Sequence, residues 1–242
     1  FNWSYYNTVY TSPKFEEFWS TVAYLNQKGI DSRIMLNFMG PVATWMGGSR
    51  INAAQNDEWV EMIASLVYYA KITRGLKFSL LAPMNEPDWD GIEGPQVDST
   101  QYVMLLKKLS QRLDAEGLSD VRLVGPDTAA IGTGVGTYIP DMMDDAILMA
   151  KVDHFGLHNY AGDSGGADAV IKRSAYPTRN FWITEVSNAW DVMTHLSQNP
   201  SAVLIWDAYD AVYNHALIRD PNNTQPGNDQ GNGPPLIDYS TQ

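Results

Sequence analysis

The sequence predicts an α/β fold of the (β/α)8 barrel type, on three observations. Short apolar or β-branched runs alternate with longer amphipathic segments, as they do when helices connect parallel strands. The length of 242 residues is close to that of a single barrel. Polar residues follow several apolar runs, at the strand ends where barrels carry their functional groups. We therefore expect one barrel domain over residues 1–220 and an irregular Asn/Gly/Pro-rich segment at 221–242.

Seven runs qualify as strands because they are short, apolar or β-branched, and bounded by turn-forming residues. In chain order they are 1–5, 32–39, 77–84, 121–125, 152–157, 180–184 and 202–206.

The helices between these strands are predicted from apolar residues that recur every three or four positions. The clearest stripe is Tyr102, Leu105, Leu106, Leu109 and Leu113. Lys107, Lys108 and Arg112 fall on the opposite face of that helix, and Gly117 is a suitable helix stop. Similar stripes cover 59–70 and 15–26. Each predicted helix lies between two predicted strands, as a barrel requires.

The charge balance excludes several classes of partner. Sixteen Lys and Arg against 28 Asp and Glu give a net charge of -12, which repels nucleic acid and anionic lipid surfaces. No apolar run approaches the roughly 20 residues that span a bilayer. The absence of Cys excludes disulfides and thiolate chemistry. Eight Trp and 13 Tyr suit the flat faces of sugar rings, although most aromatic residues in any protein fill its core.

No metal or other cofactor is expected. The four histidines, His154, His158, His195 and His215, lack the spacing of metal ligands on one helical face. Another kind of barrel enzyme, such as an aldolase or a metal-dependent hydrolase, would need a Schiff-base Lys or a His/Asp cluster at the strand ends, and none is evident.

Two glutamates stand out by position. Asn85 and Glu86 follow the run 77–84, and Glu185 follows the run 180–184. A carboxylate next to an apolar strand is costly to bury, so these two are not ordinary surface acids. Across a barrel mouth they would form the carboxyl pair that glycoside cleavage uses, one as proton donor and one as nucleophile or base.

At these residues the chain resembles the clan A glycoside hydrolases. Asn85-Glu86-Pro87 and Ile183-Thr184-Glu185 look like the ends of barrel strands four and seven in that clan. The resemblance implies that Glu86 is the acid/base and Glu185 the nucleophile, although chemistry alone permits the reverse. It also implies that Tyr160 hydrogen-bonds the nucleophile, that Asn85 holds a sugar hydroxyl, and that Trp206 floors the sugar site.

Within the clan, the segment 37–46 resembles glycoside hydrolase family 30, with family 39 a close competitor. Here Met39 and Gly47 depart from the usual family 30 residues. The resemblance implies a secreted or extracellular retaining hydrolase of β-linked oligo- or polysaccharides. If Glu86 ends strand four, one strand before it is missing, so we expect a barrel without its first β/α unit.

Further candidates for sugar binding lie just beyond strand ends. They are Trp45, Trp89 and Trp190, each of which could instead pack in the core, and His158, which could instead be a structural histidine. The rival function is a catalytically impaired or truncated barrel that acts as a carbohydrate-binding module. The specific glycan, endo or exo action and the oligomeric state stay open.

Overall fold

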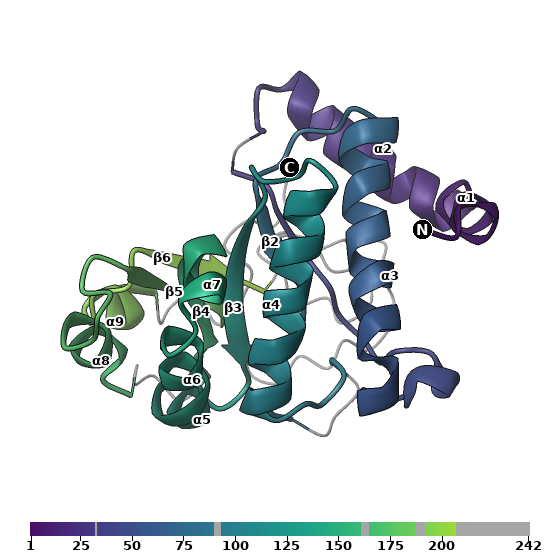
Figure 1. The fold of residues 1–242 in the computed structure, drawn as a ribbon. Helices are drawn as coiled ribbons and strands as arrows, with labels where there is room; N and C mark the ends of the chain where they lie inside the picture. The colour runs from purple at the N-terminus through teal and green to yellow at the C-terminus, as the bar shows by residue number, and fades with distance from the viewer. Residues whose placement is uncertain (32, 90–92, 161–164, 187–191, 207–242) are drawn as a thin grey trace, which may run out of the picture.

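The computed structural model describes the chain except for residues 32, 90–92, 161–164, 187–191 and 207–242. Its described strands form one parallel sheet in the order β1-β2-β3-β4-β5-β6, which curls as part of a barrel (Figure 1). The strands are β1 Met35–Asn37, β2 Leu80–Ala82, β3 Arg122–Thr128, β4 Val152–His158, β5 Asn180–Val186 and β6 Ala202–Ile205. The predicted α/β class and partial barrel are confirmed.

Helices connect these strands and cover the sheet. The longer ones are α1 Trp3–Tyr10, α2 Pro13–Gln27, α3 Asn56–Tyr68 and α4 Ser99–Ala115. The shorter ones are α5 Ile131–Thr133, α6 Ile139–Met143, α7 Ala146–Lys151, α8 Ala167–Lys172 and α9 Val192–Leu196. Single 3-10 or π turns occur at Thr44–Met46, Ala53–Gln55, Tyr69–Thr73 and Gly134–Tyr138. Helices α3 and α4 pack side by side over the sheet (Figure 1).

Helix α4 shows why the sequence predicted its helices well. Its leucine stripe is fully buried against the sheet and α3. Asp98 caps the start of the helix by accepting a hydrogen bond from the Gln101 backbone N–H at 2.8 Å. Gly117 follows the end with a φ of 78°, a backbone conformation that glycine adopts without strain. Propensity, capping and periodicity agree here, and the prediction is confirmed.

The predicted strand at 1–5 is wrong, because this segment opens helix α1. The Asn2 side chain accepts a hydrogen bond from the Tyr5 backbone N–H and so caps the helix. Tyr6 and Tyr10, four residues apart, are both buried and stack at 5.5 Å between ring centroids. The aromatic run suggested a strand, but the helical spacing of the buried rings decides the structure. Six strands are therefore described in place of the seven expected.

The two faces of the sheet carry different side chains, because neighbouring residues of a strand point to opposite faces. Leu123, Phe155 and Phe181 join the main core under the helices. On the opposite face, Leu80, Ala82 and Val124 form a small second cluster with Met35 and Trp182. The polar groups of the site lie at the carboxyl ends of the strands beside this second face.

An apolar hollow of about 580 Å³ lies beside β1, between α1, α3 and the loop that follows β1. Tyr6, Phe38, Trp45, Trp59 and Met62 are among the residues that line it. Strand β1 pairs only with β2 among the described strands, so its other edge has no strand partner there. In the described part of the chain, no helix has the length and apolar character needed to cross a membrane.

Candidate active site

Glu86 lies in the loop that follows β2, four residues beyond the last strand residue, Ala82. The residue is only 4% exposed and has a φ of 42°, a left-handed conformation that is uncommon outside glycine. Its backbone N–H donates to the Asp127 carbonyl oxygen at 2.9 Å, and the Asn85 N–H donates to the Phe38 carbonyl at 3.0 Å. Backbone bonds from the two neighbouring strands' ends thus hold this conformation in place.

Glu185 is positioned differently, since it lies inside β5 as the last residue but one. The strand continues to Val186, two residues further than predicted. The Asn159 N–H donates to the Glu185 carbonyl at 3.2 Å, which ties the ends of β4 and β5 together. The Tyr160 hydroxyl donates to Glu185 Oε1 in a short hydrogen bond. This is the tyrosine contact that the resemblance implied.

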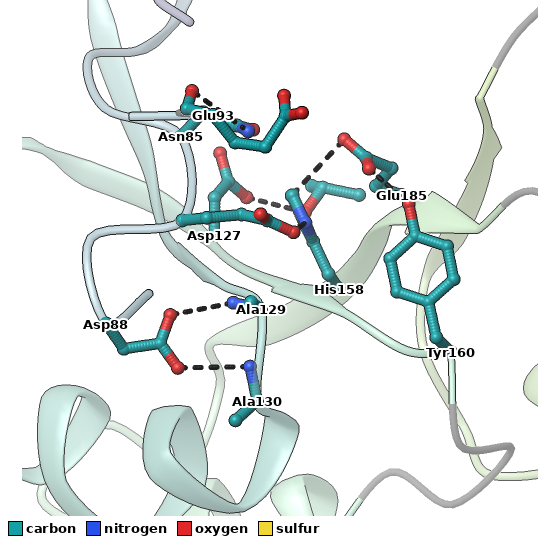
Figure 2. A network of polar contacts seen from close by, with 11 residues as sticks. Asn85, Asp88, Glu93, Asp127, Ala129, Ala130, His158, Tyr160 and Glu185 are labelled. Atoms are coloured by element: carbon teal, nitrogen blue, oxygen red, sulfur yellow. Dashed lines mark hydrogen bonds and ion pairs between the residues drawn. The ribbon is translucent and has the colours of Figure 1, made fainter. Parts of the chain in front are cut away.

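His158, the last residue of β4, lies between Glu86 and Glu185, and its contact with Glu185 can be followed in Figure 2. Its Nδ1 donates to Glu86 Oε1 at 2.8 Å, and its Nε2 is 3.7 Å from Glu185 Oε2. The imidazole is 1% exposed. One ring nitrogen of His158 and one carboxylate oxygen each of Glu86 and Glu185 all lie within 4.8 Å of one another. Two carboxyl groups 99 residues apart in sequence (185 minus 86) therefore meet at one imidazole.

The charges of this group act on one another strongly. Burial opposes the positive charge of His158, but its hydrogen bond to Glu86 and the nearby carboxylates of Glu185 and Asp127 raise the His158 pKa above its usual range. Burial raises the pKa of Glu185, while His158 and the Tyr160 hydroxyl act in the opposite direction. Burial and the Glu185 charge raise the pKa of Tyr160, so its hydroxyl stays a donor.

Asn85 reaches the same site. It is 1% exposed, its Nδ2 lies 3.5 Å from the Glu93 carbonyl oxygen, and its Oδ1 is buried without a hydrogen-bond partner (Figure 2). Glu86 Oε2 and His158 Nε2 are likewise buried without a hydrogen-bond partner. Buried polar atoms are normally paired, so these three mark a place where a polar ligand can bind.

Asp127 is a site residue that the sequence reasoning missed. It lies near the end of β3, is fully buried, and accepts a hydrogen bond from Thr184 Oγ1 at 2.5 Å. Burial raises its pKa, and the His158 charge lowers it. The signal that could have found it is the one that found Glu86, an acid directly after an apolar run, here Leu123-Val124-Gly125-Pro126.

Asp88 joins two loops beside the site. Its carboxylate accepts hydrogen bonds from the backbone N–H groups of Ala129 at 2.8 Å and Ala130 at 3.0 Å (Figure 2). Burial raises its pKa, which these bonds partly offset. This carboxylate fixes the loop after β2 against the loop after β3, and so supports Glu86.

The described aromatic candidates follow the carboxyl ends of strands. Trp206 directly follows β6 and is partly buried. Its backbone N–H donates to the Val186 carbonyl oxygen at 2.7 Å. Trp45 and Trp89 lie in the loops after β1 and β2 and are 62% and 49% exposed, so core packing does not account for them. Trp190 lies outside the described residues. Sugar binding by these side chains stays a prediction, as does the expected absence of a metal or cofactor.

No family model and no curated protein matches this chain. Several solved structures match it in fold. A glycoside hydrolase family 30 subfamily 8 xylanase from Clostridium acetobutylicum matches with a TM-score of 0.65 at 15% identity, over 88% of this chain and 56% of the other. A family 30 endoxylanase from Clostridium papyrosolvens C71 gives a TM-score of 0.59 at 14% identity, over 81% and 53%.

Family 39 is represented as well. A β-xylosidase from Caulobacter crescentus matches with a TM-score of 0.54 at 19% identity, over 76% of this chain and 47% of the other. At these identities the likeness establishes a shared fold. The chain spans about half the length of the structures that it matches.

Proposed function

We propose that this chain is the catalytic part of a retaining β-glycoside hydrolase, with Glu86 as acid/base and Glu185 as nucleophile. One observation carries the proposal: the carboxyl groups at the ends of β2 and β5 converge on His158. A retaining glycosidase requires two carboxyl groups close enough to act on the same glycosidic bond. The xylanase and the β-xylosidase that share the fold are glycoside hydrolases.

The contacts of Glu185 suit a nucleophile. The group must be ionised when it attacks the anomeric carbon, and the Tyr160 hydroxyl donates to its Oε1. His158 adds positive charge on the side of Oε2. After attack, the glycosyl group is bonded to Glu185 and the leaving oxygen has departed with a proton.

The contacts of Glu86 suit the proton donor. Oε1 is engaged by His158, while Oε2 is buried without a hydrogen-bond partner and is therefore the oxygen available to carry the acid proton. Glu86 would pass that proton to the leaving oxygen and then take one from the incoming water. The neighbouring Asn85 Oδ1, also without a partner, can accept a hydrogen bond from a sugar hydroxyl.

The substrate is proposed to be a β-linked oligo- or polysaccharide. Trp45, Trp89 and Trp206 follow the carboxyl ends of β1, β2 and β6, and flat rings of this kind can stack on sugar faces. The matched structures are named as xylanases and a β-xylosidase, so β-linked xylan is the first substrate to test. Membership of family 30, with family 39 as the competitor, and secretion are parts of the same proposal.

The test compares hydrolysis by the wild type, Glu86→Gln and Glu185→Gln. Aryl β-glycosides and β-glycans, xylan first, are incubated with each protein, and the anomeric form of the first product is followed by NMR. We expect activity with retained configuration in the wild type and its loss in both variants. Glu116→Gln is the matched control, because Glu116 pairs with Arg112 away from the site. We expect this variant to keep the wild-type activity. An inactive wild type or an inverted product rejects the proposal.

Carbohydrate binding without catalysis is the second candidate, and the exposed Trp45 and Trp89 favour it. Such a module needs the aromatic platforms but not the carboxyl pair. Calorimetric titration with the same glycans separates the two functions. Binding that persists in Trp45→Ala and Trp89→Ala rejects this candidate, and binding by a wild type that hydrolyses nothing supports it.

A further inference from the structure

We propose that Asp127 is a positioning residue that links the strand ends carrying Glu86 and Glu185 and supplies the negative charge that balances His158. The inference deepens the proposed function and rests on it for the catalytic roles of the two glutamates. Asp127 does not touch the position of the substrate in this scheme; it acts through its neighbours.

The first link runs through the main chain. The Asp127 carbonyl accepts the Glu86 N–H at 2.9 Å, although β2 itself ends at Ala82. Both residues have positive φ values, 51° for Asp127 and 42° for Glu86. Such conformations persist in non-glycine residues only where the surroundings impose them. Each of these two strained residues thus helps to hold the other.

The second link runs through the side chain. Asp127 Oδ1 accepts the Thr184 hydroxyl at 2.5 Å, and Thr184 directly precedes Glu185 in β5. Strand β4 lies between β3 and β5, so this bond crosses a whole strand. It can do so because Gly156 of β4 has no side chain; a Cβ there would collide with Asp127 Oδ1 and press on Thr184. One residue therefore connects both catalytic strand ends.

The bond to Thr184 does not by itself require a carboxyl group at position 127. An Asn would accept the Thr184 bond without burying a charge, yet a fully buried carboxylate is present and its Oδ2 has no hydrogen-bond partner. Burial is the largest influence on the Asp127 pKa and raises it, and the charged group that opposes this is His158. Burial is the largest influence on the His158 pKa and lowers it, and the Asp127 charge is among those that raise it. The carboxylate thus helps to keep His158 positive between the two glutamates.

The charged and titratable groups around this pair come from five elements. His158 faces three carboxyl groups, those of Glu86 after β2, Asp127 in β3 and Glu185 in β5. Its ring also contacts the ring of Tyr160, which lies two residues beyond the end of β4. Facing Asp127 are His158, Glu86, Glu185 and, from α4, Tyr102, whose pKa burial and the Asp127 charge raise. Within these described neighbours His158 is the one cation, so it is the group whose charged form the Asp127 charge favours.

The charge is tested by NMR titration of the His158 ring in the wild type and Asp127→Asn, with the signal assigned from His158→Gln. We expect the His158 pKa to fall by about one unit or more when the Asp127 charge is removed. Asp145→Asn is the matched control: Asp145 caps α7 and pairs with Lys107, so its loss should leave the His158 titration unchanged. An unchanged His158 pKa in folded Asp127→Asn overturns the proposal.

The link is tested by Thr184→Val, which keeps the Asp127 charge and removes the side-chain bond. We expect kcat to fall about tenfold with KM within about twofold, because the glutamates move relative to each other while substrate contacts remain. A kcat within twofold of the wild type overturns the link, and this variant decides if Asp127→Asn does not fold. An inactive wild type whose His158 pKa still falls in Asp127→Asn rejects the proposed function alone, because the titration needs no substrate.

Discussion

The ends of β2 and β5 carry the two candidate catalytic glutamates in opposite ways. Glu86 lies in a loop, has a left-handed backbone and is held by Asp127 and His158. Glu185 lies inside strand β5, next to a shift in the register of its pairing, and its side chain is held by Tyr160. The Glu185 side chain is also more exposed, 14% against 5% for Glu86.

This difference shows that pairing within the sheet positions Glu185, whereas contacts from a loop to residues of β3 and β4 position Glu86. Glu185 lies in the ladder itself, where it pairs with His158 of β4 at a point where the register of β4 and β5 shifts. The position of Glu86 depends on a few buried polar contacts, each of which is costly to break. Substitutions around Glu86 should therefore affect stability as well as activity, and those around Glu185 mainly activity.

The largest expected effect separates the two roles. Glu185→Ala should lower kcat by roughly 10⁴-fold or more, because no covalent intermediate can form. Glu86→Ala should lose about 10² to 10⁴-fold, and less on aryl glycosides whose leaving group needs no proton. Kinetics on aryl glycosides with a series of leaving groups measure the loss of kcat in both variants, and added azide distinguishes the two roles. Azide should restore turnover with inverted product in Glu185→Ala and with retained product in Glu86→Ala; the opposite pattern would exchange the two roles.

The next effect concerns stability at the β2 end. His158→Ala removes the only side-chain partner of Glu86 among the described residues and leaves a buried carboxyl group unpaired. We expect a loss of about 3 kcal/mol in the free energy of unfolding, measured by urea denaturation at pH 7. His158→Gln, which can still donate one hydrogen bond, is the control and should lose less. Equal losses in the two variants would show that packing, and not the bond to Glu86, is what His158 supplies.

At the β5 end the corresponding substitution should act on rate. Tyr160→Phe removes the hydroxyl that donates to Glu185 Oε1 but keeps the ring. A hydrogen bond to a charged group contributes about 1.5 to 3 kcal/mol, so kcat should fall about 10 to 100-fold. Because more than half of the Tyr160 surface is exposed, stability should change by less than about 1 kcal/mol. A stability loss as large as that of His158→Ala would remove the distinction between the two ends.

The sequence predicted the regular parts of this molecule and singled out the two glutamates, whose catalytic roles stay a prediction. Helix α4 and strands β3 to β6 combine propensity, periodicity and turn residues in agreement, which makes them visible without coordinates. Glu86 and Glu185 were visible because an acid after an apolar run is unusual. Trp45 and Trp89 were placed correctly beyond the ends of their strands.

The remaining features depend on contacts between distant residues. The segment 1–5 was mistaken for a strand because a short aromatic run has no clear period until the buried rings of Tyr6 and Tyr10 define one. The contacts of His158 with the two glutamates and the bond from Asp127 to Thr184 join residues that are 27 (185 minus 158) or more apart in sequence. Only the parallel register of β3, β4 and β5 brings these residues together.

The smallest expected effect is a pH dependence that belongs to the β2 end. Although burial opposes its charge, the bond to Glu86 and the nearby carboxylates raise the His158 pKa above about 6.5, the usual value. The stability that its charged form contributes is therefore complete below about pH 6.5 and is lost as pH rises through the raised pKa. Between pH 6 and pH 9 the wild type should lose about 1 kcal/mol in the free energy of unfolding. His158→Gln should lose none of this, since its side chain does not titrate. Urea denaturation at both pH values measures the difference, and parallel losses in the two proteins would place the titrating group elsewhere than at the imidazole that holds Glu86.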